Sequence, residues 1–390
     1  MNADQNLPEP TGSMPAESDS AESGSAEFAT PAEAPQAGQT PPSSICILRL
    51  SALGDVTHGV ALVNRLQKAW PDTQLTWIIG AFEHKLVHDM PSVEFITFNK
   101  KSGWRGLLQL HKQLRGRKFD ALLHIQVSLR ANIISTLVRS PLRIGYDTAR
   151  SRDLHGLFVN RRIPAQSGQH VVDAFQSFAD SLGAAPAELD WSVPIPESDL
   201  DWAREQLGGR PSFLISPCSS HALRNWNAEG YAGIANHVAD KYGMQVVLCG
   251  GPSELERTMG DAILDKCTTR PVDLIGRDTI KRMLALLSQS AALVSPDSGP
   301  AHMATCTRTP VIGLHAASNP KRSGPYLSRQ WCVDAYNEAC QKFLNRTAEQ
   351  VSWGTKVEKP GAMDLVSLEA VIDRIDALAH AHGWPGGENQ

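Results

Sequence analysis

The sequence predicts an α/β protein made of two domains, each built around a mostly parallel sheet. Short apolar runs alternate with amphipathic stretches along most of the 390 residues, a pattern typical of strand–helix–strand units with helices on both faces of a sheet. A segment at 183–200, rich in proline and with little periodicity, divides the alternation into two halves of similar size. We therefore expect domains at residues 45–195 and 196–390, with ligands bound at the carboxyl ends of the strands in a cleft between them.

Apolar runs define the expected strands, and helical spacing defines the expected helices. In the first half, strands are expected at 45–50, 74–79, 93–98, 119–125 and 142–146, and helices after Asp55 and at 104–114, 129–138 and 171–182. In the second half, strands are expected at 212–216, 245–249, 272–275, 291–294 and 309–314, and helices at 228–242, 254–267, 279–288, 300–306 and 365–381.

The first 44 residues differ in composition from the rest of the chain. They contain seven acidic residues, no lysine or arginine, and one aromatic residue, Phe28. So little apolar surface does not offset the entropy lost on ordering. We expect residues 1–44 to be a disordered acidic tail.

Positive charge is concentrated in one part of the first half. The segment Lys100–Arg162 holds 14 Lys and Arg residues against three acids. Such a segment suggests a polyanionic partner, namely a phosphorylated glycolipid, a nucleic acid or an acidic membrane, although a solvated basic face is the alternative. Aromatic residues are not interleaved with the basic ones as in a single-strand binder, which disfavours nucleic acid.

Several classes of protein are disfavoured by what the sequence lacks. The seven cysteines form no CxxC pair and no Cys/His cluster with zinc spacing, which disfavours a disulfide scaffold or structural zinc and fits a reducing cytoplasm. No stretch approaches the roughly 18 apolar residues of a membrane span. No GxGxxG dinucleotide motif, GxxxxGK[ST] phosphate loop or suitably placed DxD is present. We therefore expect neither a cofactor nor a metal ion.

The segment SALGDVTH at 51–58 joins the first strand to the first helix. Gly54 permits a tight turn, and Asp55 stands at the start of the helix, where it can act as a general base on a hydroxyl group. The alternative is that Asp55 or Thr57 is only a helix cap.

Three further motifs follow strands of the second half. In VSPDSGPAH at 294–302, Pro300 suits the first position of a helix whose amides favour a phosphate. In PCSSHALRNW at 217–226, hydroxyl groups and Arg224 could hold a diphosphate. In GGPSE at 250–254, the glycines allow close approach, and Glu254 could accept hydrogen bonds from a ribose. An ordinary capped helix, a polar surface loop and a helix-start glutamate are the respective alternatives.

The run ILRLSALGDVTH at 47–58, together with SPDSGPAH at 295–302, resembles the ADP-heptose:lipopolysaccharide heptosyltransferases, glycosyltransferase family 9. The similarity covers the chain from about Ile45, and the segment 145–162 resembles the acceptor side of these enzymes. It implies the GT-B fold, two Rossmann-like domains facing across a cleft. It also implies inverting transfer of heptose from ADP-L-glycero-D-manno-heptose to the Kdo/heptose inner core of lipopolysaccharide.

The resemblance assigns a role to each motif. Asp55 would be the general base that deprotonates the acceptor. The donor would be held by Ser219, Ser220, Arg224, Glu254, Asp297, Ser298, Gly299 and His302. The acceptor would meet Ser51, His58, Arg130, Arg150 and Arg152, the last three chosen for their charge. Arg224 and the two serines stand where the family often has lysine and threonines, so the diphosphate would meet a guanidinium fork.

The expected partners are therefore an ADP-sugar donor and the anionic core of lipopolysaccharide, and no nucleic acid. Attraction to anionic lipid would hold a cytoplasmic enzyme peripherally at the inner face of the inner membrane. Two other hypotheses remain: a sugar-nucleotide epimerase of the same fold, and a non-enzymatic protein that binds anionic lipid or nucleic acid through the basic segment.

Overall fold

A computed structural model describes residues 40–386 of the chain. Within them the chain forms two six-stranded sheets in which every pair of neighbouring strands is parallel. The strand orders are β3-β2-β1-β4-β5-β6 and β12-β11-β10-β7-β8-β9, which is the same Rossmann order in both halves. The predicted α/β architecture with two parallel sheets is confirmed.

The first sheet is built from residues 44–162 and the second from residues 212–334. The strands are β1 (Ser44–Leu48), β2 (Gln74–Gly80), β3 (Val93–Phe98), β4 (Ala121–His124), β5 (Leu142–Gly145), β6 (Arg161–Arg162), β7 (Ser212–Ile215), β8 (Gln245–Leu248), β9 (Val272–Asp273), β10 (Ala292–Pro296), β11 (Val311–His315) and β12 (Val333–Asp334). Since neighbouring strands are parallel, all carboxyl ends of a sheet lie at one edge, which we call its carboxyl edge.

Helices connect the strands as the alternation predicts. They are α1 (Leu53–Ala69), α2 (His84–Val87), α3 (Gly103–Leu114), α4 (Leu129–Ser135), α5 (Val171–Ser181), α6 (Glu197–Leu207), α7 (Ala228–Tyr242), α8 (Glu254–Leu264), α9 (Ile280–Ser288), α10 (Gly299–Thr307), α11 (Pro320–Ser323), α12 (Tyr336–Leu344) and α13 (Leu368–His382). Side chains that accept an amide hydrogen fix several starts: Asn227 caps α7, Ser253 caps α8 and Thr279 caps α9.

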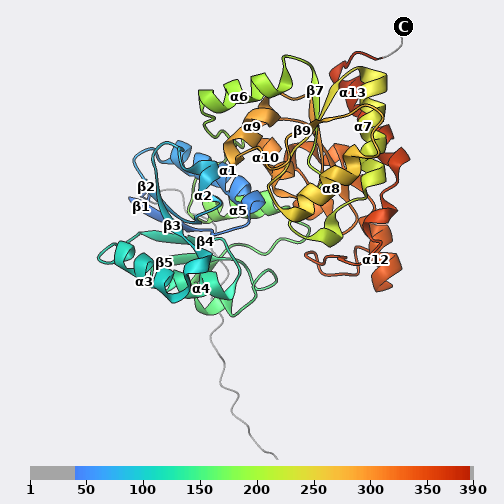
Figure 1. Ribbon diagram of the computed structural model, residues 1–390. Helices are drawn as coiled ribbons and strands as arrows, with labels where there is room; N and C mark the ends of the chain where they lie inside the picture. The colour runs from blue at the N-terminus through green and yellow to red at the C-terminus, as the bar shows by residue number, and fades with distance from the viewer. Residues whose placement is uncertain (1–39, 387–390) are drawn as a thin grey trace, which may run out of the picture. The chain divides into compact units, whose positions relative to one another are not determined.

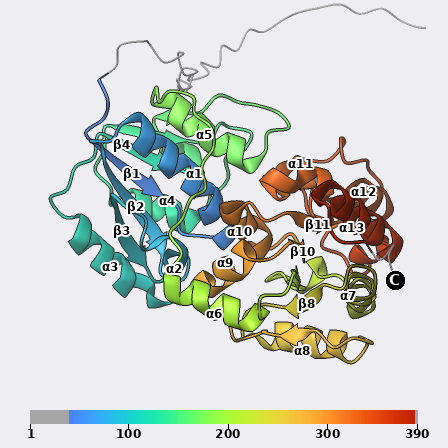
Figure 2. The same ribbon diagram turned by 90° about the horizontal axis from the view of Figure 1, so that it is seen from above.

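Both faces of each sheet are covered. In the first half, α3 and α4 lie on one face and α1 and α5 on the other (Figure 1). In the second half, α9 and α10 lie on one face and α7 and α13 on the other (Figure 2). The apolar cluster beneath α1 and α5 is continuous with the one beneath α9 and α10, and α1 packs directly on α10. This packing brings the starts of α1 and α10 together.

The structure differs from the predicted elements in a few places. The helix α6 begins at Glu197, inside the segment predicted as a linker, because Pro196 stands at its N-cap, outside the helical hydrogen bonds. The short strands β6 and β12 and the helices α2, α11 and α12 were not predicted. Residues 1–39 of the predicted tail lie outside the described residues, whereas Ser44 already belongs to β1. The boundary between the domains at residue 195 stays a prediction.

Candidate active site

Asp55 lies in the first turn of α1, directly after the carboxyl end of β1. Its Oδ2 accepts a hydrogen bond from the backbone amide of Ala52 at 3.2 Å and forms an ion pair with Nη2 of Arg49. Within residues 40–386 no hydrogen bond or ion pair engages Oδ1, and the side chain keeps 31% of its surface exposed. One carboxylate oxygen is thus held in place, and the side chain as a whole remains partly exposed.

Arg49, which holds Asp55, is itself fixed by the interior of the first half. Its Nη1 donates to the carbonyl oxygen of Ile125 at 2.5 Å, and its guanidinium carbon lies 5.6 Å from the ring centre of Phe175. A guanidinium bonded on several sides has little freedom to move. The carboxylate of Asp55 therefore has a defined orientation, which a catalytic base requires.

The start of α10 is built differently from those of α7, α8 and α9. Ser298 occupies the N-cap position but makes no side-chain cap. Its Oγ lies 2.7 Å from Oγ of Ser295, which donates to the carbonyl oxygen of Ser216 at 2.9 Å. Ser295 has one hydroxyl hydrogen, so Ser298 is the donor between the two serines. Within the described residues no side chain accepts a hydrogen bond from the first amides of α10, and such a helix start favours an anion.

The first turns of α1 and α10 are in direct contact. A Cβ atom added to Gly54 would stand 2.3 Å from Cδ2 of His302, and one added to Gly299 would stand 3.1 Å from Cδ2 of Leu53. Glycine at position 54 is therefore required by the close approach of the histidine ring. The contact brings Asp55 of the first half beside the SPDSG loop (residues 295–299) of the second half.

Three histidines from three segments meet beside Asp297. The ring centre of His58, on α1, lies 4.7 Å from that of His302 and 5.8 Å from that of His170, the N-cap residue of α5. Burial lowers the pKa of His58 well below its usual value, and the charges of His302 and His170 act in the same direction. His58 is therefore neutral near pH 7, and it is buried rather than open to a ligand.

Asp297 itself remains a carboxylate. Burial alone would raise the pKa of Asp297. It is outweighed by the hydrogen bond from His302, whose Nε2 lies 3.3 Å from Oδ1, and by the charges of His302, His315 and Lys356. The pKa of Asp297 is therefore well below its usual value. An ionised acceptor beside the free amides of α10 is suited to hold the hydroxyl groups of a sugar whose phosphate lies at the helix start.

The loop after β7 carries the predicted diphosphate residues. Ser219 is buried, and its amide donates to Oδ1 of Asn225 at 2.7 Å while its hydroxyl donates to the carbonyl oxygen of His221 at 3.0 Å. Ser220 is exposed. The loop therefore has a fixed shape, set by its own hydrogen bonds.

Arg224 closes that loop, in the short helix Ala222–Arg224. Its Nε and Nη2 lie 2.7 and 2.6 Å from Oε1 of Glu358. Lys356 stands two residues before Glu358. Burial lowers the pKa of Lys356. The carboxylates of Asp297 and Glu358 act against that lowering, whereas the charge of Arg224 adds to it. Lys356 thus lies near both Asp297 and Arg224, and the guanidinium of Arg224 is held by a carboxylate of the chain itself.

The loop after β8, which precedes the predicted ribose-binding residue Glu254, is held by Glu256. Glu256 accepts hydrogen bonds from the amide of Gly251 at 2.8 Å and from the hydroxyl of Ser253 at 2.7 Å, whereas Glu254 is exposed at the first position of α8. Burial raises the pKa of the nearby Asp278 to about 7, and the charge of Glu256 contributes. Glu254 stays a prediction for ribose binding.

The predicted acceptor residues differ in their surroundings. Ser51 is half-buried one residue after Leu50, and Arg130 and Arg152 are exposed after β4 and β5. Arg150 is bound by Asp147 and by Oε1 of Gln169, and its Nη2 donates to the carbonyl oxygen of Pro164 at 3.0 Å. Arg130 and Arg152 are therefore free to meet an anionic ligand, whereas Arg150 shapes the loop that carries Arg152.

Comparison with known proteins identifies the family. The family model of glycosyltransferase family 9 (heptosyltransferase) matches residues 107–353. The lipopolysaccharide core heptosyltransferase OpsX of Haemophilus influenzae is 40% identical over 338 residues, which cover 86% of this chain and 97% of the relative. The chain belongs to glycosyltransferase family 9.

Solved structures share the fold of this family 9 enzyme. A family 9 glycosyl transferase from Veillonella parvula aligns with a TM-score of 0.70 and 20% identity, over 87% of this chain and 97% of the other. The Escherichia coli heptosyltransferase WaaC with ADP aligns with a TM-score of 0.65 and 17% identity, over 86% of this chain and all of the other (100%). The fold is thus of the GT-B type, and the family assignment favours a heptosyltransferase over an epimerase or a non-enzymatic binding protein.

Several residues that contact the candidate site of this heptosyltransferase were not predicted from the sequence. Arg49 orients Asp55, Glu256 holds the glycine loop, and Glu358 with Lys356 faces Arg224. Arg49 stands within the quoted motif, so its position next to Asp55 could have been noticed. Glu358 is 134 residues from Arg224, and no local pattern connects the two.

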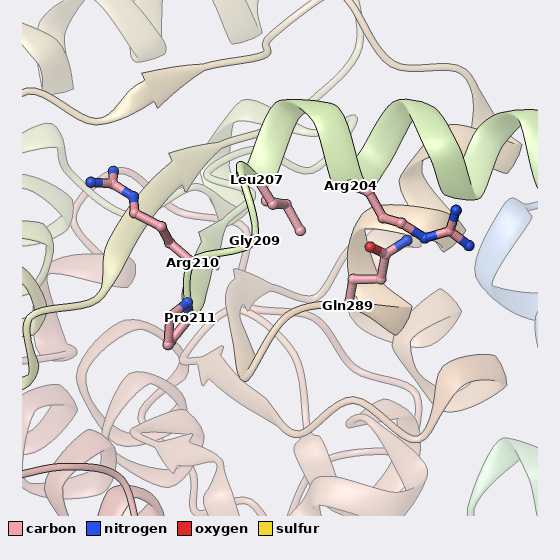
Figure 3. A pocket seen from close by; sticks show the side chains of 6 residues that line it. All are labelled: Arg204, Leu207, Gly209, Arg210, Pro211 and Gln289. Carbon is pink, nitrogen blue, oxygen red and sulfur yellow. The ribbon is translucent and has the colours of Figure 1, made fainter.

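A cavity of about 300 Å³ lies away from these residues. Leu207, Gly209, Arg210 and Pro211 before β7, together with Arg204 and Gln289, line it (Figure 3). It opens at the amino ends of β7 and β10, whereas the candidate site residues follow the carboxyl ends of the strands, so we do not assign it to the candidate active site. Between residues 40 and 386 no cluster of three His, Cys, Asp or Glu side chains could hold a metal ion, and none of the described helices could span a bilayer.

Proposed function

We propose that this family 9 enzyme transfers a heptose from ADP-L-glycero-D-manno-heptose to the inner core of lipopolysaccharide, with inversion at the anomeric carbon. The relative from Haemophilus influenzae is a lipopolysaccharide core heptosyltransferase, and the structure of WaaC contains ADP. Their chemistry and the residues that follow the strand ends support the same donor and acceptor class here.

One observation carries the proposal: the turn that holds Asp55 packs on the turn that holds Ser298 and Gly299. A phosphate at the start of α10 would place the linked sugar close to Asp55. The partly exposed carboxylate of Asp55 would then be within reach of an acceptor hydroxyl that approaches the same sugar. Transfer requires this juxtaposition of base, acceptor and donor.

The proposed step is a single displacement. Oδ1 of Asp55 takes the proton of the acceptor hydroxyl as its oxygen forms a bond to the anomeric carbon. The bond between that carbon and the diphosphate breaks, and ADP leaves with the electron pair. Arg49 keeps Oδ2 in place during the transfer. Attack from the face opposite the leaving group inverts the configuration of the carbon.

The negative charge that develops on ADP needs fixed positive groups around it. We assign this role to the amides at the start of α10, Arg224 and Lys356, and groups already oriented before the reaction are effective because they need no reorganisation. We assign Ser219 and Ser220 to the diphosphate, Glu254 to the ribose, and Asp297 with His302 to the heptose.

The proposal also concerns location and metal ions. We place the enzyme in the cytoplasm, bound peripherally at the inner membrane, where its acceptor is anchored. The residues assigned here neutralise the leaving group without a metal ion, so we expect turnover to survive dialysis against EDTA. Loss of turnover on dialysis, restored by a divalent cation, would contradict this part.

The decisive test is a transfer assay. ADP-heptose is incubated with the full chain and a panel of truncated lipopolysaccharide cores, and the products are identified by mass spectrometry. We expect one heptose to be added to one core length, and proton NMR of that product to show an inverted anomeric centre. If no core gains a heptose while the protein releases a free or epimerised sugar from the donor, the proposal fails.

A further inference from the structure

The most exposed apolar side chains of the described chain gather in the first half. All seven large apolar residues with at least 45% of their surface exposed belong to it, and the three in the second half are only 36–39% exposed. The seven are Phe82 after β2, Trp104 and Leu108 after β3, Leu129 and Ile133 after β4, and Leu154 and Leu157 after β5. We call these seven residues the apolar rim.

The rim lies along one edge of the first sheet. Four consecutive strands of the chain, β2 to β5, contribute the segments that carry it, and each segment begins at the carboxyl end of its strand. The strands β3, β2, β1, β4 and β5 lie next to one another in that order, so the segments span about 19 Å at the usual strand spacing. Asp55 follows β1, in the middle of the same edge.

Exposed cations accompany the rim in every segment. Nζ of Lys85 lies 6.0 Å from the ring centre of Phe82, and the guanidinium carbon of Arg105 lies 5.7 Å from the ring of Trp104. Arg130 follows Leu129 directly, and Arg152 stands two residues before Leu154. All four cations are exposed. Apolar side chains with Lys or Arg beside them are typical of surfaces that enter the head-group region of an anionic bilayer.

A buried network holds the most exposed part of the rim in place. The amide of Tyr146 donates to Nε2 of His155 at 3.2 Å, so Nδ1 of His155 carries the hydrogen and donates to Oδ1 of Asn132 at 3.1 Å. Nδ2 of Asn132 donates to the carbonyl oxygen of Asp153 at 2.6 Å.

The same network ties this loop to the start of α4. Oδ2 of Asp153 accepts the amide hydrogen of Leu129 at 3.1 Å. Burial lowers the pKa of His155 to about 4, so the network does not change its charge near pH 7. The 154–157 segment and the start of α4 are therefore fixed to each other, with their leucines turned outward.

We propose that the apolar rim inserts into the head-group region of an anionic lipid bilayer, with the carboxyl edge of the first sheet facing the membrane. The inference rests on the proposed function, which supplies an acceptor anchored in lipid. Asp55 then faces the layer in which the acceptor sugar stands. A protein partner fits less well, because the centre of a protein interface is depleted in charged residues, whereas here a cation adjoins the apolar residues of each segment.

The test is sedimentation of the full chain with vesicles, without donor or acceptor. Vesicles of phosphatidylcholine with about 30% phosphatidylglycerol are compared with vesicles of phosphatidylcholine alone. We expect binding to the anionic vesicles only, and the double variant Leu154→Ser/Leu157→Ser to bind them about tenfold less tightly because it loses two inserted side chains. The matched control is Leu327→Ser/Leu368→Ser, two exposed leucines of the second half, which should bind as the parent does. Thermal unfolding and ADP affinity establish that each variant is folded.

Two results would overturn the inference. If Arg130→Glu/Arg152→Glu abolishes vesicle binding while Leu154→Ser/Leu157→Ser leaves it intact, the surface meets head groups by charge alone and inserts nothing. If light scattering shows that the leucine variant converts a dimer to a monomer, the rim is an interface between two copies of the chain. Vesicle binding does not require transfer, so a chain that binds vesicles but transfers no heptose would refute the proposed function alone.

Discussion

The two halves share one strand order but present different carboxyl edges. In the second half two charged groups of the candidate site already have partners within the chain: Arg224 is held by Glu358, and Asp297 by His302. In the first half Arg130 and Arg152 are exposed beside exposed leucines. The first half, residues 45–195, has 18 basic and 12 acidic residues, and the second has 19 and 22. The same fold thus offers a preformed site for a small anion on one side and an open, cationic surface on the other.

This difference matches the two substrates of the proposed reaction. A nucleotide sugar is small and can be surrounded, so groups fixed in advance by internal hydrogen bonds lose little entropy when it binds. A lipid-anchored acceptor is presented by a surface, so the residues that meet it must stand outside the protein core. The following variants test whether the division of labour holds.

The largest effect is expected at Asp55, the one first-half residue that we place in the chemical step. Asp55→Asn keeps the size of the side chain but removes its ability to take a proton, so turnover should fall about 10²-fold or more while the dissociation constant of ADP stays within about twofold. Steady-state kinetics and calorimetry measure the two quantities. Asp72→Asn, in the exposed turn after α1, is the control. Equal losses of binding and turnover would show that Asp55 is only a helix-start residue.

A smaller effect is expected at Arg224 in the second half. Arg224→Ala removes a charge-assisted contact to the diphosphate, and a loss of about 1.5–3 kcal/mol corresponds to about ten- to hundredfold weaker ADP binding. Adenosine affinity should change little, because adenosine has no phosphate. Arg210→Ala, at the opposite edge of the same sheet in the cavity of Figure 3, is the control. Unchanged ADP affinity in calorimetry of the Arg224 variant would remove this residue from the donor site.

Glu358 tests the internal pairing itself, with an effect of opposite sign. Its carboxylate holds Arg224 and would repel a diphosphate, so Glu358→Gln should tighten ADP binding about two- to fivefold, the range expected of a partly exposed ion pair. Calorimetry at low and high salt measures the change, which should shrink as salt screens the charges. Glu349→Gln, exposed on the same connecting segment, is the control. Weaker binding would mean that Glu358 aligns Arg224 for the ligand rather than competing with it.

The sequence predicted what depends on local pattern and missed what depends on distant partners. Apolar runs and helix-start residues located the βα units of both sheets, and Asp55 and Ser298 stand where their motifs placed them. The helix α6 was missed because the prolines at 194 and 196 suggested a linker, although proline is tolerated where a helix begins. His58 stays a prediction for the acceptor site, and its burial could not be foreseen, because α10, which lies about 240 residues further along the chain, leaves no signal near position 58.

The smallest expected effect is on stability, at a partly buried acid of the second half. Burial raises the pKa of Asp278 from its usual value near 3.9 to about 7, so between about pH 4 and pH 7 the unfolded chain is ionised there while the folded chain is protonated. Folding then takes up a proton, and its cost grows with pH until about 7 and is constant above it.

Asp278→Asn has no such cost. Its melting temperature should therefore exceed that of the parent by an amount that grows from pH 5 to pH 7, to about 2 °C or more, and then stays level to pH 8. Scanning calorimetry across this range measures the difference. Asp265→Asn, exposed at the end of α8, should show none. An increase in melting temperature that is the same at every pH would mean that Asp278 is ionised throughout this range. The second half would then tolerate an unpaired carboxylate next to Glu256 as readily as the first half tolerates unpaired cations.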